Sequence, residues 1–193
     1  LTNTLGRIGN EVYNNQRSEV NELSEGFAPG KVGSSTMPHK RNPVIPSEIV
    51  SYARLIRTTM VEALTSMEST NERDVRAIGM ESEYLARCCC LADAALDRSI
   101  LLMRDLEVHD SAIRRNLDLL GGLVYTEALM MRLSKEYGRL EAHEILYELA
   151  QQAISENRNF REILLNDQRV SAKLTKKDLD QIMDPAHYVG LSG

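Results

Sequence analysis

The stretch from residue 26 to residue 43, GFAPGKVGSSTMPHKRNP, gathers side chains that could hold an anion whose negative charge grows during a reaction. Two hydroxyl groups, Ser34 and Ser35, follow a glycine, and Lys40 and Asn42 come within the next eight residues. Glycine lets backbone N–H groups approach a ligand closely, lysine attracts the anion, and serine and asparagine orient it by hydrogen bonds. Together these residue types suit a carboxylate or a phosphate group.

Two other interpretations of this stretch compare with its sequence as follows. Each residue taken singly fits a Gly/Pro-rich surface turn with scattered polar side chains. A phosphate-binding P-loop has the pattern GxxxxGK[ST], in which a hydroxyl residue follows the lysine. That pattern is not satisfied, because Gly30 and Lys31 are followed by Val32.

The segments around this stretch carry apolar residues at helical spacing. Residues 1–24 show one apolar stripe, whereas residues 25–46 contain three glycines and four prolines that prevent a regular helix. A second helix is expected from Ser47 and a third over 75–105, each much longer than three or four turns. Long helices joined by a short turn predict an antiparallel bundle.

The rest of the chain predicts shorter helices. Thr175 and Asp178 form a capping-box signal for the last of them. The expected helices cover about 110–119, 123–137, 140–156, 160–165 and a final segment to Met183. The predicted fold is therefore all-α: residues 1–106 form part of a central long-helix domain with a catalytic loop at 25–46, and residues 107–193 form a small helical C-terminal domain.

Composition narrows the function classes. The chain has 193 residues, 42% of them hydrophobic and 26% charged, which is typical of a globular protein. Its net charge of −5 argues against nucleic acid as a partner, and no apolar run is long enough to span a membrane. No secretion signal is visible, so a cytoplasmic protein is expected. No two of the four histidines form an i,i+4 pair, so neither a metal nor another cofactor is expected.

The full loop string resembles the signature of the fumarase/aspartase superfamily, G-S-x-x-M-x-x-K-x-N. The matching positions are Gly33, Ser34, Met37, Lys40 and Asn42. Five fixed residue types at fixed spacing make a chance match improbable. In that family the signature lies on a mobile loop between long helices, which agrees with the elements expected here.

The resemblance extends over nearly the whole chain. Residues 71–74, NERD, are similar to the HERD of adenylosuccinate lyases. Residues 115–125, RNLDLLGGLVY, and residues 170–190 resemble 3-carboxy-cis,cis-muconate cycloisomerases more closely. The resemblance implies a homotetramer with a central bundle of long helices, in which each active site takes segments from three subunits.

The resemblance also implies a mechanism. Family members abstract a proton beside a carboxylate, pass through a dianionic aci-carboxylate and expel a leaving group, or run the reverse. Ser34 would be the base, and Lys40 and Asn42 would bind the carboxylate that gains charge. Ser35 and Thr36 are expected to be supporting donors. The histidine that assists the leaving group in relatives lies upstream of the segments present here.

Arg73 is expected to contact a substrate anion, with a solvated charge between Glu72 and Asp74 as the alternative. The substrate is expected to be a small polycarboxylate, with a 3-carboxy-cis,cis-muconate cycloisomerase-like reaction first. Adenylosuccinate cleavage is the alternative. Five residues separate Asn42 from Glu48, where adenylosuccinate lyases usually have four, and the histidine before ERD is replaced by Asn71. Asp74, by contrast, resembles the purine enzymes.

Two non-enzymatic interpretations stay open. One is a helical scaffold that keeps the family fold without catalysis, as lens crystallins do. The other is an anion- or nucleotide-binding module built on the Gly-rich loop. The chain also opens with Leu1 in the middle of an apparent helix, so upstream sequence is expected. The 193 residues alone are therefore expected to be inactive.

Overall fold

The computed structural model describes residues 1–27, 36–37 and 40–190. These residues group into two compact units, Leu1–Ile113 and Arg114–Gly193. The domain division near residue 106 stays a prediction. The all-α fold is confirmed, with a pair of long antiparallel helices followed by smaller ones. No helix in the described ranges is long and apolar enough to cross a membrane.

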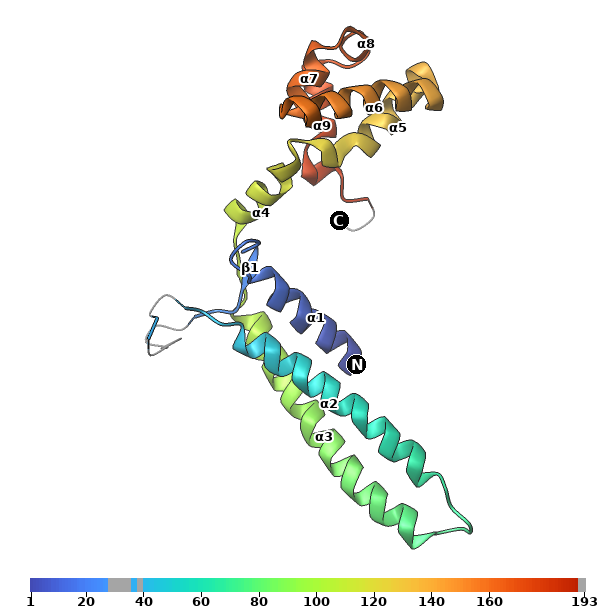
Figure 1. Cartoon of the computed structure of the whole chain (residues 1–193). Coiled ribbons are helices and arrows are strands. Elements are labelled where there is room, and N and C mark those ends of the chain that lie inside the picture. The colour runs from blue at the N-terminus through green and yellow to red at the C-terminus, as the bar shows by residue number, and fades with distance from the viewer. Residues whose placement is uncertain (28–35, 38–39, 191–193) are drawn as a thin grey trace. The chain divides into compact units, whose positions relative to one another are not determined.

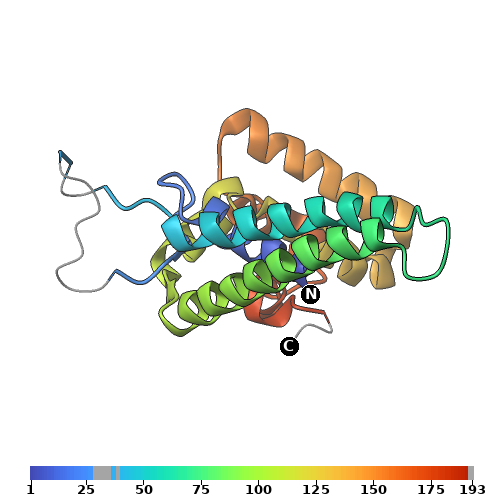
Figure 2. The same cartoon turned by 90° about the horizontal axis from the view of Figure 1, so that it is seen from below.

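The first unit is built on three helices: α1 (Thr2–Asn15), α2 (Val44–Ser66) and α3 (Val75–Arg104). The helix α2 packs against α1 and α3, and the α2–α3 pair runs antiparallel along its length (Figures 1 and 2). The α1–α2 contact is close, because a Cβ atom added at Gly9 would lie 3.0 Å from the backbone oxygen of Pro46. The core of this unit is small: Leu5, Val12, Ile49, Ala95 and Leu102.

The first unit also contains two short strands. Strand β1 (Leu23–Ser24) pairs antiparallel with β2 (Glu107–Val108), with Leu23 opposite Val108. The sequence did not predict this pair. It brings the segment before the loop against the segment after α3.

Helix α1 ends earlier than the apolar stripe over 1–24 predicted. The chain turns after Asn15, and Asn21 adopts a left-handed conformation with φ of 53°. Asparagine tolerates this conformation better than most residues, since its short side chain can bond locally. The last apolar residues of the stripe therefore lead into β1.

Helix α2 begins at Val44, three residues before the predicted start at Ser47. Pro46 lies in its first turn, where the missing N–H has no intrahelical partner to lose. The N-cap position is Pro43, whose side chain accepts no hydrogen bond. The start of α2 therefore needs a capping group from elsewhere.

The second unit is a set of short helices around one core. The helix α4 (Asp110–Leu117) leads into it, and the predicted capping box of Thr175 and Asp178 is confirmed at the start of the last α-helix. Its remaining elements are η1 (Asp118–Leu120), η2 (Leu123–Tyr125), α5 (Thr126–Tyr137), α6 (Arg139–Glu156), α7 (Phe160–Asn166), α8 (Gln168–Ser171), α9 (Lys176–Ile182) and η3 (Pro185–His187).

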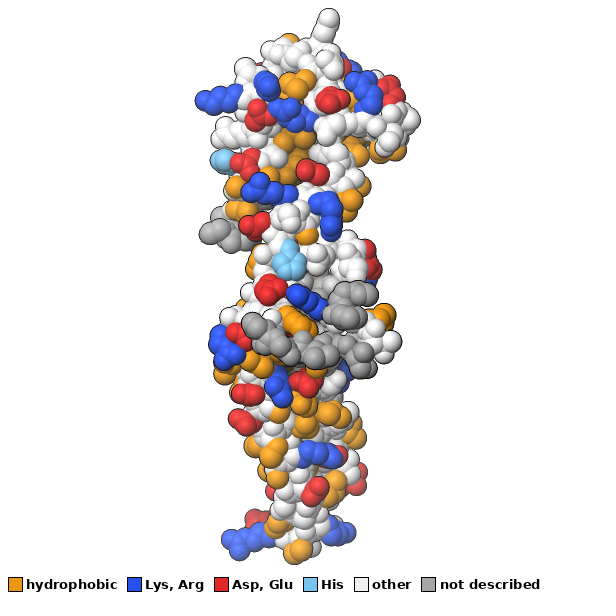
Figure 3. Space-filling view, turned by 90° about the vertical axis from the view of Figure 1, so that its left-hand side faces the viewer, with side chains coloured by type: hydrophobic (Ala, Val, Ile, Leu, Met, Phe, Trp, Pro, Cys, Tyr) orange, Lys and Arg blue, Asp and Glu red, His pale blue; other side chains and the backbone are white. Residues whose placement is uncertain are grey.

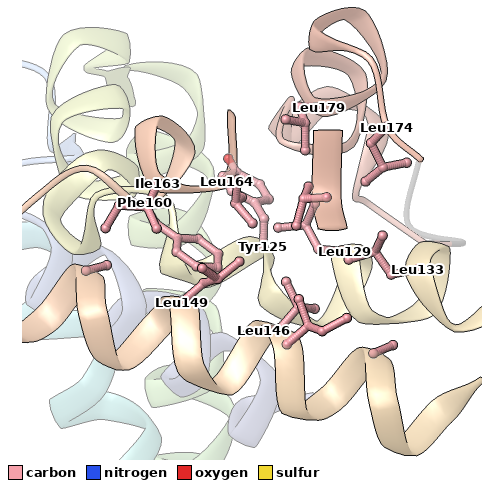
Figure 4. Packing of buried hydrophobic residues seen from close by; sticks show 14 residues of the cluster. Tyr125, Leu129, Leu133, Leu146, Leu149, Phe160, Ile163, Leu164, Leu174 and Leu179 are labelled. Carbon is pink, nitrogen blue, oxygen red and sulfur yellow. The ribbon is translucent and has the colours of Figure 1, made fainter. Parts of the chain in front are cut away.

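The core of the second unit is continuous and apolar. Figure 4 shows its side chains meeting from α5, α6 and α7 and from the segments that follow. The buried residues are Tyr125, Leu129, Leu133, Ala142, Ile145, Leu146, Leu149, Ala153, Phe160, Ile163, Leu164, Val170, Leu174 and Leu179.

Candidate active site

Two of the predicted catalytic residues, Lys40 and Asn42, line one cavity in the first unit. This cavity has a volume of about 590 Å³. Its lining residues come from the turn after α1, from β1, from the end of the loop and from the segment after β2. They are Gln16, Ser18, Asn21, Ser24, Met37, Lys40, Arg41, Asn42 and His109.

The predicted hydroxyl residues of the loop are described only in part. Ser34 and Ser35 lie outside the described residues, so their predicted roles as base and supporting donor stay predictions. Thr36 is described and exposed, but it is not among the lining residues.

The end of the loop is held by local backbone contacts before it enters α2. The Lys40 N–H donates to the Met37 carbonyl at 3.0 Å, and the Val44 N–H donates to the Asn42 carbonyl at 2.9 Å. The Arg41 guanidinium lies 4.8 Å from the centre of the Phe27 ring, a cation–π distance. Phe27 precedes the catalytic signature and Arg41 lies between its last two fixed positions, Lys40 and Asn42, so this contact joins the two arms of the loop.

The cavity contains a histidine that the sequence did not single out. The His109 Nε2 lies 3.2 Å from the Ser24 hydroxyl, and its Nδ1 lies 3.0 Å from the Asn21 carbonyl oxygen. The Ser24 hydroxyl also donates to Glu107 at 3.1 Å. His109 is 85 residues from Ser24, and the β1–β2 pairing helps to bring them together, so no spacing in the sequence signals the contact.

Arg73 lies at the other end of α2 from Lys40. It is exposed in the turn between α2 and α3, with φ of 56°. Because α2 has 23 residues and a helix rises about 1.5 Å per residue, the two ends are separated by about 34 Å. Figure 1 shows the loop and this turn at opposite ends of α2. One copy of the chain therefore does not bring Arg73 to Lys40.

Asp74, next to Arg73, has a structural role. It is the N-cap of α3, and its carboxylate accepts from the Arg76 side chain and the Arg76 backbone N–H. These bonds, the side-chain bond first, hold the pKa of Asp74 well below its ordinary value. The NERD segment therefore caps α3 through its last residue, Asp74, whose ion pair is with Arg76 and not with Arg73.

Metal binding has no support in the described residues. Within the ranges that the structure covers, no three histidine, cysteine or acidic side chains are close enough together to hold a metal ion. The groups that the cavity offers are an amine, amides, hydroxyls, a guanidinium and an imidazole. They can bind an anion and move a proton.

Comparison with known proteins agrees with this chemistry. A family described as "Lyase" matches residues 1–57, and one described as "Adenylosuccinate lyase C-terminus" matches residues 122–193. The N-acetyl-S-(2-succino)cysteine lyase of Dickeya dadantii is 37% identical over 98% of this chain and 42% of its own length. The adenylosuccinate lyase of Methanocaldococcus jannaschii is 37% identical over 100% of this chain and 42% of its own length.

A solved structure supports the same relationship. The 3-carboxy-cis,cis-muconate lactonizing enzyme of Pseudomonas putida superposes with a TM-score of 0.89 at 38% identity, over 98% of this chain and 42% of that chain. The chain thus spans about two fifths of the length of these relatives. The chain is nearly equally similar to these three proteins, whose names give three different substrates.

Proposed function

Because this chain belongs to the fumarase/aspartase superfamily, we propose that the full-length protein abstracts a proton beside a carboxylate and then eliminates a leaving group, or runs the reverse addition. The observation that supports this most is the shared cavity of Lys40 and Asn42, two fixed positions of the family signature. A scaffold without catalysis would not require these two side chains to line one cavity.

In the proposed mechanism, Ser34 takes the proton. An ordinary serine hydroxyl is too weak an acid for this role, so the alkoxide requires stabilisation by nearby N–H groups and Lys40. The Lys40 ammonium and the Asn42 amide bind the substrate carboxylate. This carboxylate gains charge in the intermediate, so the same contacts are stronger in the transition state than in the ground state.

The separation of Arg73 from Lys40 favours a site built from several copies. If Arg73 contacts a substrate anion, the loop of one subunit must meet the α2–α3 turn of another. We therefore propose a homotetramer whose active sites are shared between subunits. The exposed apolar residues on α2 and α3 provide surface for such packing.

For the substrate, we place a carboxylated muconate first and adenylosuccinate second. The residues that support this order are the segment 115–125, the tail 170–190, and Asn71 in place of a histidine. A 2-succino thioether, the substrate class in the name of one relative, shares the same chemistry: a proton next to a carboxylate and a leaving group on the next carbon.

The test is a side-by-side assay of the full-length protein on 3-carboxymuconolactone and its muconate, adenylosuccinate and N-acetyl-S-(2-succino)cysteine. We expect turnover of at least one, with the muconate pair best. Efficient cleavage of adenylosuccinate without muconate activity would reverse the order. No turnover of any of them, with the protein folded, would favour the scaffold or the anion-binding module.

Two substitutions then test the assigned roles. Ser34→Ala removes the base and is expected to lower kcat by about 10²- to 10⁴-fold with little change in folding. Lys40→Met removes a contact made in both the ground state and the transition state, so we expect KM to rise and kcat to fall. Lys135→Met, an exposed lysine on α5, is the matched control and is expected to leave both constants unchanged.

A further inference from the structure

The two arms of the loop are joined at its base by side chains outside the catalytic signature. Glu25 stands at the start of the first arm, and Ile45 stands just after the second. The Glu25 carboxyl oxygen Oε2 accepts the Ile45 backbone N–H at 2.6 Å, and Glu25 is only 3% exposed. A short bond to a buried carboxyl group is among the stronger hydrogen bonds in a protein.

This bond satisfies a backbone N–H at the start of α2 that has no acceptor within the helix. The first N–H groups of a helix lack intrahelical acceptors, and a side chain at the N-cap usually accepts one of them. Here the N-cap is Pro43, which has no side-chain acceptor. Glu25 therefore caps α2 from the other arm, where its acidic group also complements the positive end of the helix dipole.

Gln16 makes a second link between the same arms. Its Oε1 accepts the Glu25 backbone N–H at 2.9 Å. Its Nε2 lies 3.5 Å from the Arg41 carbonyl oxygen, which is a weaker contact. Gln16 also lines the cavity with Lys40 and Asn42, so one side chain touches the first arm, the second arm and the cavity.

The first arm packs closely against the end of α3 just after Glu25. A Cβ atom added at Gly26 would collide with the backbone oxygen of Asp105, the C-cap residue of α3. Glu25 is thus fixed on one side by Gln16 and followed on the chain by a residue packed against α3. These contacts keep the first arm of the loop beside the start of α2.

We propose that Glu25, assisted by Gln16, is a positioning residue that fixes the two arms of the loop relative to each other and so holds Lys40 and Asn42 at the cavity. The inference rests on the proposed function for its effect on turnover. Asn42 lies three residues before Ile45, the residue that Glu25 holds, and Lys40 lies five before it. A displaced α2 start would therefore move both side chains.

The test compares Glu25→Ala and Glu25→Gln in the full-length protein. Glu19→Ala is the matched control, because it removes an exposed carboxylate that forms an ion pair with Arg17. Hydrogen–deuterium exchange reports the Ile45 amide without any assay of activity. Steady-state kinetics on the substrate found in the panel reports the effect on the site.

In Glu25→Ala, we expect the Ile45 amide to exchange at least about tenfold faster, while amides in the middle of α2 keep their protection. We expect kcat/KM to fall by about 10- to 100-fold, because small misplacements of binding groups are costly. Glu25→Gln keeps an oxygen that can accept the Ile45 N–H, so it should recover part of both effects. Glu19→Ala should match the wild type.

Three outcomes would contradict the account, and they can be told apart. Unchanged Ile45 exchange in Glu25→Ala would overturn the capping of α2 by Glu25, whatever the activity. Faster exchange with wild-type kinetics would overturn the positioning role alone. A wild-type protein inactive on every substrate of the panel would overturn the proposed function, and with it the effect on turnover.

Discussion

The C-terminal unit and the α2–α3 hairpin differ in how far their apolar residues are buried. The unit that begins at Arg114 buries fourteen residues in one cluster, drawn from several short helices. The 30-residue helix α3 buries only Ala95, Ser99 and Leu102, all in its last third. The C-terminal unit completes its core with its own residues, whereas the α2–α3 hairpin leaves most of its length uncovered.

The uncovered surface of the hairpin is strongly apolar. Figure 3 shows hydrophobic side chains exposed along it between charged ones. On α2 and α3 the exposed large residues are Val44, Leu55, Met60, Val61, Leu64, Val75, Ile78, Met80, Leu85, Leu96, Ile100 and Met103. A surface of this kind marks an interaction site. The difference between the two regions supports the proposed packing of the hairpin against other subunits.

The largest expected effect comes from the core of the C-terminal unit. Leu164 is fully buried, so Leu164→Ala removes packed methyl groups and leaves a cavity. We expect a loss of about 2–5 kcal/mol in the free energy of unfolding, measured by urea titration.

The matched control is Leu64→Ala on α2, where the leucine is 60% exposed. In the 193-residue chain this change should stay within about 0.5 kcal/mol, since it removes little buried area. Equal losses at the two leucines would show that the hairpin is covered within the chain and would end the comparison.

A smaller effect is expected at the start of α9. The Thr175 hydroxyl accepts the Asp178 N–H, and the Asp178 carboxylate accepts the Thr175 backbone N–H. Thr175→Ala removes half of this reciprocal cap and should destabilise the C-terminal unit by about 1 kcal/mol in the same titration. Thr65→Ala, within the exposed part of α2, is the comparison; its hydroxyl bonds only the Val61 carbonyl of its own helix.

The smallest effect is the pH dependence of this cap. The bonds from Thr175, the side-chain bond first, lower the pKa of Asp178. A carboxyl group whose pKa is lower in the folded state stabilises that state above its unfolded pKa of about 3.9, and the stabilisation is lost as the pH falls through the folded value. The difference between the urea midpoints of wild type and Thr175→Ala should therefore shrink as the pH falls below about 4. A constant difference would rule out a contribution from Asp178.

Much of the helical framework could be predicted because its signals are local. Apolar stripes located α2 and α3, glycines and prolines located the loop, and Thr175 with Asp178 located the start of α9. The exposure of Met60 and Leu64 could not be predicted, since a stripe has the same spacing whether its partner lies in the chain or outside it.

The missed features of the site depend on contacts between distant segments. The β1–β2 pair has two residues in each strand, too few to show an alternating apolar pattern, and it helps to bring His109 to Ser24. At the start of α2, the Ile45 N–H donates to Glu25, a residue of the other arm, and the N-cap Pro43 has no side-chain acceptor. The signature predicts catalytic residues at the loop, but it does not predict which contacts hold them.

The most direct test of the central claim is subunit mixing in the full-length protein. Lys40→Met and Arg73→Met are each expected to be nearly inactive, because each damages one part of a site shared between copies. With the proposed shared site, mixed oligomers would contain sites in which an intact loop meets an intact α2–α3 turn. We expect mixing, with subunit exchange verified by mass spectrometry, to restore turnover well above that of either variant alone. Exchange without any recovery would contradict a site built from the loop of one copy and the Arg73 turn of another.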